Sequence, residues 1–233
     1  MPIYVNGNQV GSDSNVLGNN WEAVLVNGND TFASQITIDD FEQYNGTTLS
    51  STYSTNTGSG SRSVISSAAL SSGSTQGLYI DGPSIMVSMP GDGLENYFQP
   101  NNTSVWYANA QSSDNWNFAL GQQQSTNTMN GAEGYWLEYQ FGSGARLVYR
   151  DGSRNVFGTE NSSSLNTNQT YRVEWSISSG GYHEVYFRTL GGSTAAYLDG
   201  NDSRFISSTM AVGYWGSGGA NVYIDNHHID PSL

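Results

Sequence analysis

Four places in the chain put large aromatic rings beside each other or beside amides. Exposed tryptophan and tyrosine rings pack on the apolar faces of sugars, while neighbouring amides and carboxylates bond to the hydroxyls. Adjacent strand residues point to opposite faces, so each adjacent ring pair should place one ring inside and one outside. The sequence therefore predicts a glycan-binding surface, although a core or a subunit contact would use the same residues. The candidate residues are Trp106, Tyr107, Trp116, Tyr135, Trp136, Tyr214 and Trp215.

Short strands are the elements that must position these rings. Many segments alternate, as in Tyr171–Ile177, where Tyr171, Val173 and Trp175 share one face. No segment shows a helical period, and Gly, Ser, Asn and Asp separate the segments. This pattern predicts an all-β fold, a two-sheet antiparallel β-sandwich of the jelly-roll type. The expected strands are 36–41, 62–69, 77–80, 84–89, 104–110, 115–121, 134–141, 145–150, 171–177, 182–190, 209–215 and 221–224.

Residues 1–34 differ from the rest of the chain. Asn6-Gly7 and Asn27-Gly28 each stand between apolar residues, which is the strongest short signal for a β-hairpin. Two hairpins of this size bury little surface by themselves. We therefore divide the chain into an N-terminal arm (1–34) and a sandwich (35–233). The arm is expected to dock on the main domain or on a neighbouring subunit of a larger assembly. The opening Pro2–Gly7 also resembles the first residues of many bacteriophage structural proteins.

The charge pattern restricts the partners and the source. All seven basic residues are arginines, against twenty Asp and Glu, giving a net charge of −13. Carboxylates and weakly hydrated guanidinium groups suit concentrated salt, so the composition predicts a halophilic source. Nucleic acid and anionic membrane surfaces are excluded as partners because the sequence offers no basic patch. There is no cysteine, no apolar run of membrane-spanning length and no secretory signal at the N-terminus, so we expect no membrane insertion.

The order of the strand motifs resembles a known family. Ile38-Asp39-Asp40-Phe41-Glu42 comes first, and Ser63–Ser66 and Gln76–Ile80 follow; Tyr171–Trp175, Glu184–Arg188 and Val222–Asn226 come later. Together, over residues 36–229, they resemble the concanavalin A-like, laminin-G-like jelly-roll domain of haloarchaeal and viral surface proteins. The fold hosts both binding and catalytic proteins.

Similar families place a structural Ca²⁺ where the first and last strands meet. Carried over by position, the resemblance implies Asp40, Glu42 and Asp225 as ligands, with Asp39 as the outward alternative. Ca²⁺ prefers several hard oxygen ligands of this kind. The alternative is that Asp39-Asp40 protects a strand edge and that Asp225-Asn226 forms a simple turn.

Signs of catalysis are weak. β-Glucanases of this fold carry a Glu-x-Asp-x-Glu triplet, which this chain lacks. Glu174 and Glu184 lie on consecutive expected strands, but a glutamate such as Glu174 is better explained as the cross-strand partner of Arg188. Tyr182-His183 with nearby arginines is the one arrangement that would suit a lyase.

We therefore expect a non-catalytic virion surface protein of a halophile virus, as a tail, spike or capsid decoration. It would bind host cell-surface glycans through the sandwich, contact other virion subunits and form a homo-oligomer. It would reach the exterior on the virion surface after lysis. The alternatives are a secreted-type glycoside hydrolase or polysaccharide lyase of the same fold, and a purely structural assembly protein.

Overall fold

The structure, a computed structural model, describes most of the sandwich and short pieces of the N-terminal segment. The described residues are 3–5, 8–11, 25–26, 29–30, 36–44, 54–56, 61–81, 85–88, 100–111, 118–123, 133–160, 165–206, 211–216 and 221–230. They contain no helix with the length and apolar character needed to cross a membrane.

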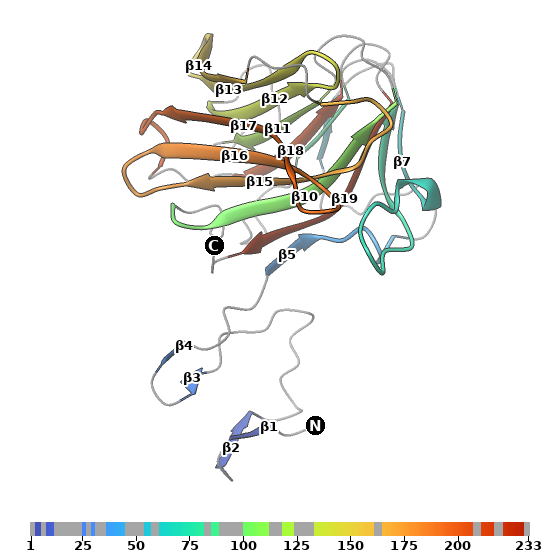
Figure 1. The fold of residues 1–233 in the computed structure, drawn as a ribbon, viewed down its shortest axis with the longest axis vertical. Coiled ribbons are helices and arrows are strands. Elements are labelled where there is room, and N and C mark those ends of the chain that lie inside the picture. Colours follow the sequence, from blue (N-terminus) through green and yellow to red (C-terminus); the bar gives the residue numbers. More distant parts are fainter. Residues whose placement is uncertain are drawn as a thin grey trace.

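Two antiparallel sheets face each other and form a β-sandwich (Figure 1). The larger sheet has the strand order β17-β16-β15-β10-β19-β8-β7, and β5 pairs with β19 beside this path. Its strands are β5 (Ile36–Asp39), β7 (Ser61–Ile65), β8 (Gly77–Asp81), β10 (Thr103–Ala110), β15 (Tyr171–Ile177), β16 (Tyr182–Thr189), β17 (Thr194–Asn201) and β19 (Asn221–Asp230). A short 3-10 helix, η2 (Ser66–Ala68), follows β7.

The smaller sheet has the order β14-β13-β12-β11-β18-β9-β6. Its strands are β6 (Ser54–Asn56), β9 (Ile85–Ser88), β11 (Phe118–Gln123), β12 (Gly134–Gln140), β13 (Gly144–Arg150), β14 (Arg154–Glu160) and β18 (Ala211–Gly216). Neighbouring strands often come from distant parts of the chain, as where β11 pairs with β18. The predicted all-β jelly-roll sandwich is confirmed.

Large aromatic rings fill the space between the sheets. The predicted alternation of β15 is confirmed, since Tyr171, Val173 and Trp175 are all buried in this core. The indole N–H of Trp106 on β10 donates to the hydroxyl oxygen of Tyr139 on β12 at 3.3 Å, which connects the two sheets. Further core rings are Phe41, Tyr135, Phe141, Phe187 and Tyr214.

At one side of the sandwich the two sheets come together through glycines. Gly200 on β17 lies against β14, where a Cβ atom would be only 2.7 Å from the carbonyl oxygen of Phe157. Gly158 on β14 lies in the same way against the carbonyl oxygen of Asp199. Because neither position has room for a side chain, the backbones of β14 and β17 can approach each other directly.

The predicted strands agree with the structure in most places and differ in a few. β6, β14 and β17 were not among the predicted strands, and the expected strand 62–69 ends in η2. The hairpins predicted near the N-terminus are present as β1 (Ile3–Val5) with β2 (Asn8–Gly11) and β3 (Leu25–Val26) with β4 (Asn29–Asp30). Their predicted Asn-Gly turns lie outside the described residues.

Candidate functional site

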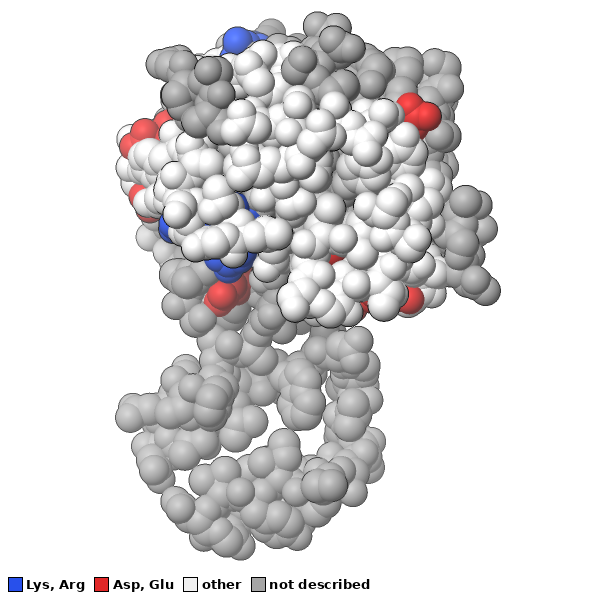
Figure 2. All heavy atoms as spheres, turned by 45° about the vertical axis from the view of Figure 1, so that its right-hand side comes forward, with Lys and Arg blue, Asp and Glu red and all other residues white. Residues whose placement is uncertain are grey.

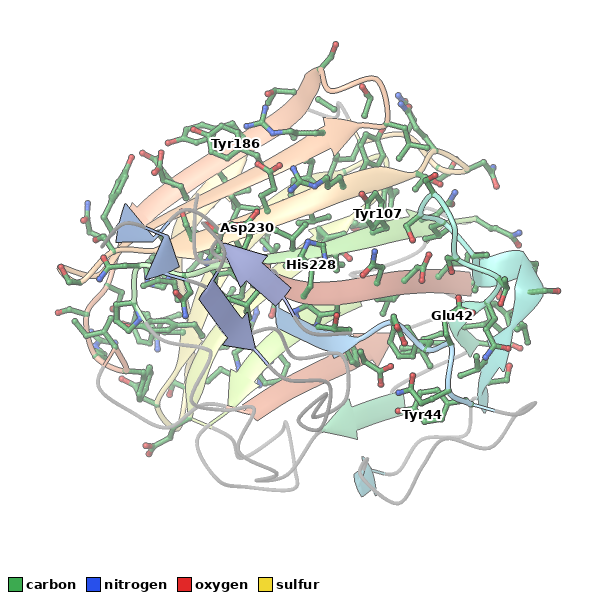
Figure 3. The ribbon with its side chains drawn as sticks, turned by 90° about the horizontal axis from the view of Figure 1, so that it is seen from below. Glu42, Tyr44, Tyr107, Tyr186, His228 and Asp230 are labelled. Carbon is green, nitrogen blue, oxygen red and sulfur yellow. The ribbon has the colours of Figure 1, made fainter. Side chains whose placement is uncertain are left out.

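The residues proposed as calcium ligands bind a loop of the protein itself. The Asp225 carboxylate accepts backbone N–H bonds from Leu70 and Ser71, both at 2.8 Å. The Ser74 hydroxyl lies 2.8 Å from an oxygen of Glu42 and 3.1 Å from Oδ1 of Asp225. Residues 70–76 therefore lie between the two carboxylates, and Figure 3 shows Glu42 beside this turquoise segment.

Glu42 also accepts N–H bonds from Thr75 at 2.7 Å and Gln76 at 3.2 Å. Burial acts to raise its pKa, but the hydrogen bonds from Thr75, Ser74 and Gln76 outweigh it, and the pKa is lowered. Asp40 caps the backbone N–H of Glu42 at 3.1 Å. The described residues contain no group of three or more His, Cys, Asp or Glu placed to hold a metal. Protein donors bind all three carboxylates in the structure, and a calcium site at Asp40, Glu42 and Asp225 stays a prediction.

Most of the aromatic residues predicted to bind sugar are buried. Trp106, Tyr135 and Tyr214 point into the core between the sheets, so they cannot meet a ligand. Trp136 points to the outer face of the smaller sheet, but its side chain is covered as well. These four assignments were wrong because three of the rings fill the core between the sheets, while Trp136 is covered on the outer face, where the Arg150 guanidinium lies over it. Tyr107 is half-buried on the outer face of the larger sheet, as its alternation with Trp106 predicts. Trp116 and the side chain of Trp215 lie outside the described residues.

The described outer face of the larger sheet carries a group of tyrosines that are not among the residues predicted to bind sugar. Tyr182 and Tyr186 project from β16, and Tyr197 projects from β17 opposite Tyr186. The rings of Tyr186 and Tyr197 are 4.8 Å apart and tilted by 45°. Tyr197 is 38% exposed, and the other two are half-buried. We call these three residues the tyrosine cluster.

Two carboxylates hold the tyrosine cluster together. The Tyr182 hydroxyl donates to Asp199 at 2.6 Å, and those of Tyr197 and Tyr186 donate to Glu184 at 3.2 and 3.4 Å. The pKa of Tyr182 is raised chiefly by its bond to Asp199 and that of Tyr186 chiefly by burial. The pKa of Tyr197 is raised too, first by its contact with Tyr182. All three phenols therefore stay protonated near neutral pH, and the site offers flat rings and hydrogen-bonding oxygens side by side.

An ion-pair group continues this face towards β10. Glu174 on β15 binds Arg172 and also accepts from Nε of Arg188 at 2.9 Å. The Arg188 guanidinium lies 4.6 Å from the centre of the Tyr186 ring, which fixes one side of the tyrosine cluster. Tyr107 follows on β10 as the cross-strand partner of Arg172. Figure 3 looks onto this sheet, with Tyr186, Tyr107 and His228 over successive parts of it.

The arrangement considered for a lyase does not form. Tyr182 lies on the outer face, whereas the next residue, His183, is buried among core rings. Burial lowers the pKa of His183 to about 4. The two side chains therefore lie on opposite sides of the sheet and cannot act on one substrate. Glu174 is held by arginines, which confirms its interpretation as a cross-strand partner of Arg188.

The signal for the tyrosine cluster was present in the sequence. Tyr182, Glu184, Tyr186 and Arg188 alternate along one strand and must share a face. The cluster needs β17 as well, and that strand is rich in small and polar residues that do not suggest a strand. The described surface drawn in Figure 2 is mostly uncharged, with a few acidic and basic groups.

The comparisons with known proteins define the fold. The sequence matches no protein-family model and no curated protein. The structure is similar to the carbohydrate-binding module CBM66 from Bacillus subtilis, with a TM-score of 0.52 and 11% identity over 77% of this chain and 95% of that one. It is also similar to the exoplasmic/lumenal domain of VIP36 in its Ca²⁺/Man3GlcNAc-bound form, with a TM-score of 0.54 and 11% identity over 78% and 84% of the two chains. The chain therefore has the concanavalin A-like jelly-roll fold.

Proposed function

We propose that this protein is a non-catalytic glycan-binding protein and that the tyrosine cluster is its binding surface. One observation carries the proposal: three tyrosines on adjacent strands share the exposed face of the sheet, and two carboxylates fix their hydroxyls. A sugar ring would lie against Tyr197 and Tyr186, whose rings supply the apolar contact. Glu184 and Asp199 would accept hydrogen bonds from its hydroxyls.

Similar proteins support the same function. One of the two neighbours is named as a carbohydrate-binding module, and the other is described with a bound mannose-containing glycan. At about one residue in nine identical, these neighbours do not identify the sugar. The chemistry of the tyrosine cluster favours a neutral sugar, because two carboxylates would repel an anionic one at this place.

Binding to an array of neutral oligosaccharides, followed by calorimetry on each hit, tests this proposal. Tyr197→Ala should weaken binding roughly tenfold or more, as is usual for a tyrosine at the centre of a contact. Tyr79→Ala is the matched control, since Tyr79 is a half-buried tyrosine of the same face and β15, β10 and β19 separate it from β16. Equal affinities of Tyr197→Ala and the unchanged protein would reject the tyrosine cluster as the site.

The proposed setting is the surface of a halophile virus particle, where the protein would serve as a tail, spike or capsid decoration that meets host glycans. Two sequence features support this setting. Seven arginines without a lysine, against twenty acidic residues, suit concentrated salt. The two small hairpins that precede the sandwich in the chain suit an arm that packs against other subunits.

A further inference from the structure

A second polar group lies on the smaller sheet, on its outer face. Arg150 on β13 is the direct cross-strand partner of Arg154 on β14. Like charges placed opposite each other on two strands repel, so this pair needs a compensating anion. Glu138 on β12 provides one carboxylate, and Nε of Arg154 donates to its two oxygens at 3.0 and 3.1 Å.

Arg150 is only partly neutralised by this carboxylate. Its Nη2 is 3.9 Å from Glu138, beyond hydrogen-bonding distance, and its Nε is buried with no acceptor in the described part of the chain. The guanidinium lies 4.7 Å from the centre of the Trp136 ring, which holds it in place. Burial lowers the pKa of Arg150, Glu138 opposes this effect, and Arg154 adds to it. Arg150 is thus a partly desolvated cation that retains N–H donors for another acceptor.

Further arginines lie near Arg150 on this part of the sheet. The residue of β12 opposite Arg150 is Gly134, which has no side chain. Arg146, the cross-strand partner of Glu138, brings a third arginine to the same group. Three arginines and one glutamate therefore lie on this part of the sheet, in a protein whose net charge is −13. Val156 lies two residues beyond Arg154 on β14 and is 43% exposed, so one apolar side chain is accessible on the same strand as Arg154.

We infer that this arginine group binds the carboxylate of an acidic sugar, with Arg150 as its principal partner. A guanidinium presents parallel N–H donors that match the two oxygens of a carboxylate, and such bonds are about twice as strong as neutral ones. Trp136 supports Arg150 from beneath, and Val156 contacts the apolar face of the sugar ring. The site is on a different sheet from the tyrosine cluster and does not depend on the function proposed there.

Calorimetry on the full chain at low salt, with a galacturonic acid trisaccharide as the probe, tests the inference. The methyl ester of the same trisaccharide keeps the rings and removes the charges. We expect the acid to bind, the ester to fail and the affinity for the acid to fall as salt screens the charges. Equal binding of acid and ester, or no binding of the acid, would overturn the inference.

Three variants locate the site. Arg150→Gln should lower the affinity for the acidic trisaccharide about tenfold to a hundredfold, as expected for the loss of hydrogen bonds from a charged group. Val156→Asp changes an exposed position, so the fold should be kept. Its carboxylate should repel that of the sugar and lower the affinity for the acidic trisaccharide. Arg188→Gln makes the same change of net charge as Arg150→Gln but on the other sheet, and it should bind like the unchanged protein.

The outcomes distinguish the arginine group from the tyrosine cluster, and an acidic sugar from a small anion such as acetate. Unchanged affinity in both Arg150→Gln and Val156→Asp would place acid binding elsewhere and overturn the assignment. Acetate that binds as tightly as the trisaccharide would show a site for small anions and not for sugars, which also overturns it. Tyr197→Ala should leave acid binding unaltered, so failure of the tyrosine cluster and failure of the arginine group are distinguishable.

Discussion

Trp175 and His183 are joined by a hydrogen bond inside the core, where the indole N–H donates to Nδ1 of the imidazole at 3.3 Å. Because Nδ1 accepts, the ring carries its hydrogen on Nε2, which donates to the carbonyl oxygen of Asp202 at 3.1 Å. His183 is therefore neutral in the folded protein. A second buried histidine, His227, lies between Ser104 and Tyr214 at 2.7 and 2.6 Å.

These two histidines predict that acid destabilises the protein. Burial lowers the pKa of His183 to about 4 and that of His227 to about 3, whereas both titrate near pH 6.5 in the unfolded chain. Between these values the unfolded state binds more protons, so the free energy of unfolding falls as the pH drops below about 6.5. His183 alone accounts for a loss on the order of 3 kcal/mol at pH 4. Urea unfolding at pH 7.5 and 4.5, followed by tryptophan fluorescence, measures the loss.

His183→Gln is the control for the acid effect. An amide at this position can accept from Trp175 and donate to Asp202 without titrating. The variant should lose less stability than the unchanged protein between the two pH values. An identical loss would show that other groups cause it.

The contacts of Asp225 predict a stability effect that is independent of calcium. Asp225→Asn removes acceptor capacity for the N–H groups of Leu70 and Ser71 and should lower the free energy of unfolding by about 1–3 kcal/mol. Unfolding is measured once with calcium and once with chelator, and the two losses should agree. A loss seen only when calcium is present would restore Asp225 as a metal ligand.

A side chain in place of Gly200, at the contact between β17 and β14, should lower the free energy of unfolding. Gly200→Ala places a Cβ against the backbone of Phe157, which cannot move away without shifting β14. We expect a loss of about 1–3 kcal/mol in thermal or urea unfolding, typical of overpacking. Gly192→Ala is unsuitable as a control because its φ is positive, whereas Gly191→Ala tests an exposed glycine with space around it and should cost less.

The N-terminal arm predicts the state of assembly. In molar salt, light scattering coupled to size exclusion should give a discrete oligomer for the full chain and a folded monomer after deletion of residues 1–34. Circular dichroism checks that the shortened protein keeps its β structure. If the full chain and the shortened protein are both folded monomers, the arm does not mediate assembly, and the proposed virion setting loses support.

Local patterns in the sequence identified much of the sandwich because alternation is a local property. Trp106 and Tyr107 show this, since one ring is buried and the next reaches the outer face as predicted. Whether an outward ring is exposed depends on residues distant in the chain. Arg150 lies over Trp136, and the residues next to Trp136 in the sequence do not predict this contact. Alternation thus predicts the face of a residue but not what covers it.

The acidic residues illustrate the same limit at longer range. Pairing of the first and last strands was expected, and β5 does pair with β19, which brings Glu42 and Asp225 near each other. Their contacts depend on the loop at 70–76, which begins 155 residues before Asp225 in the chain. Tyr197 depends in turn on the register of β16 against β17, which fixes its position opposite Tyr186.

Close approach at Gly158 and Gly200 has a consequence for solubility. The outermost strand of a sheet usually presents unpaired N–H and C=O groups that can template the addition of a strand from another molecule. Here β14 and β17 are the end strands of their sheets, and each covers the open side of the other. The two glycines thereby protect this side of the sandwich from strand addition and limit polymerisation of the protein along this edge.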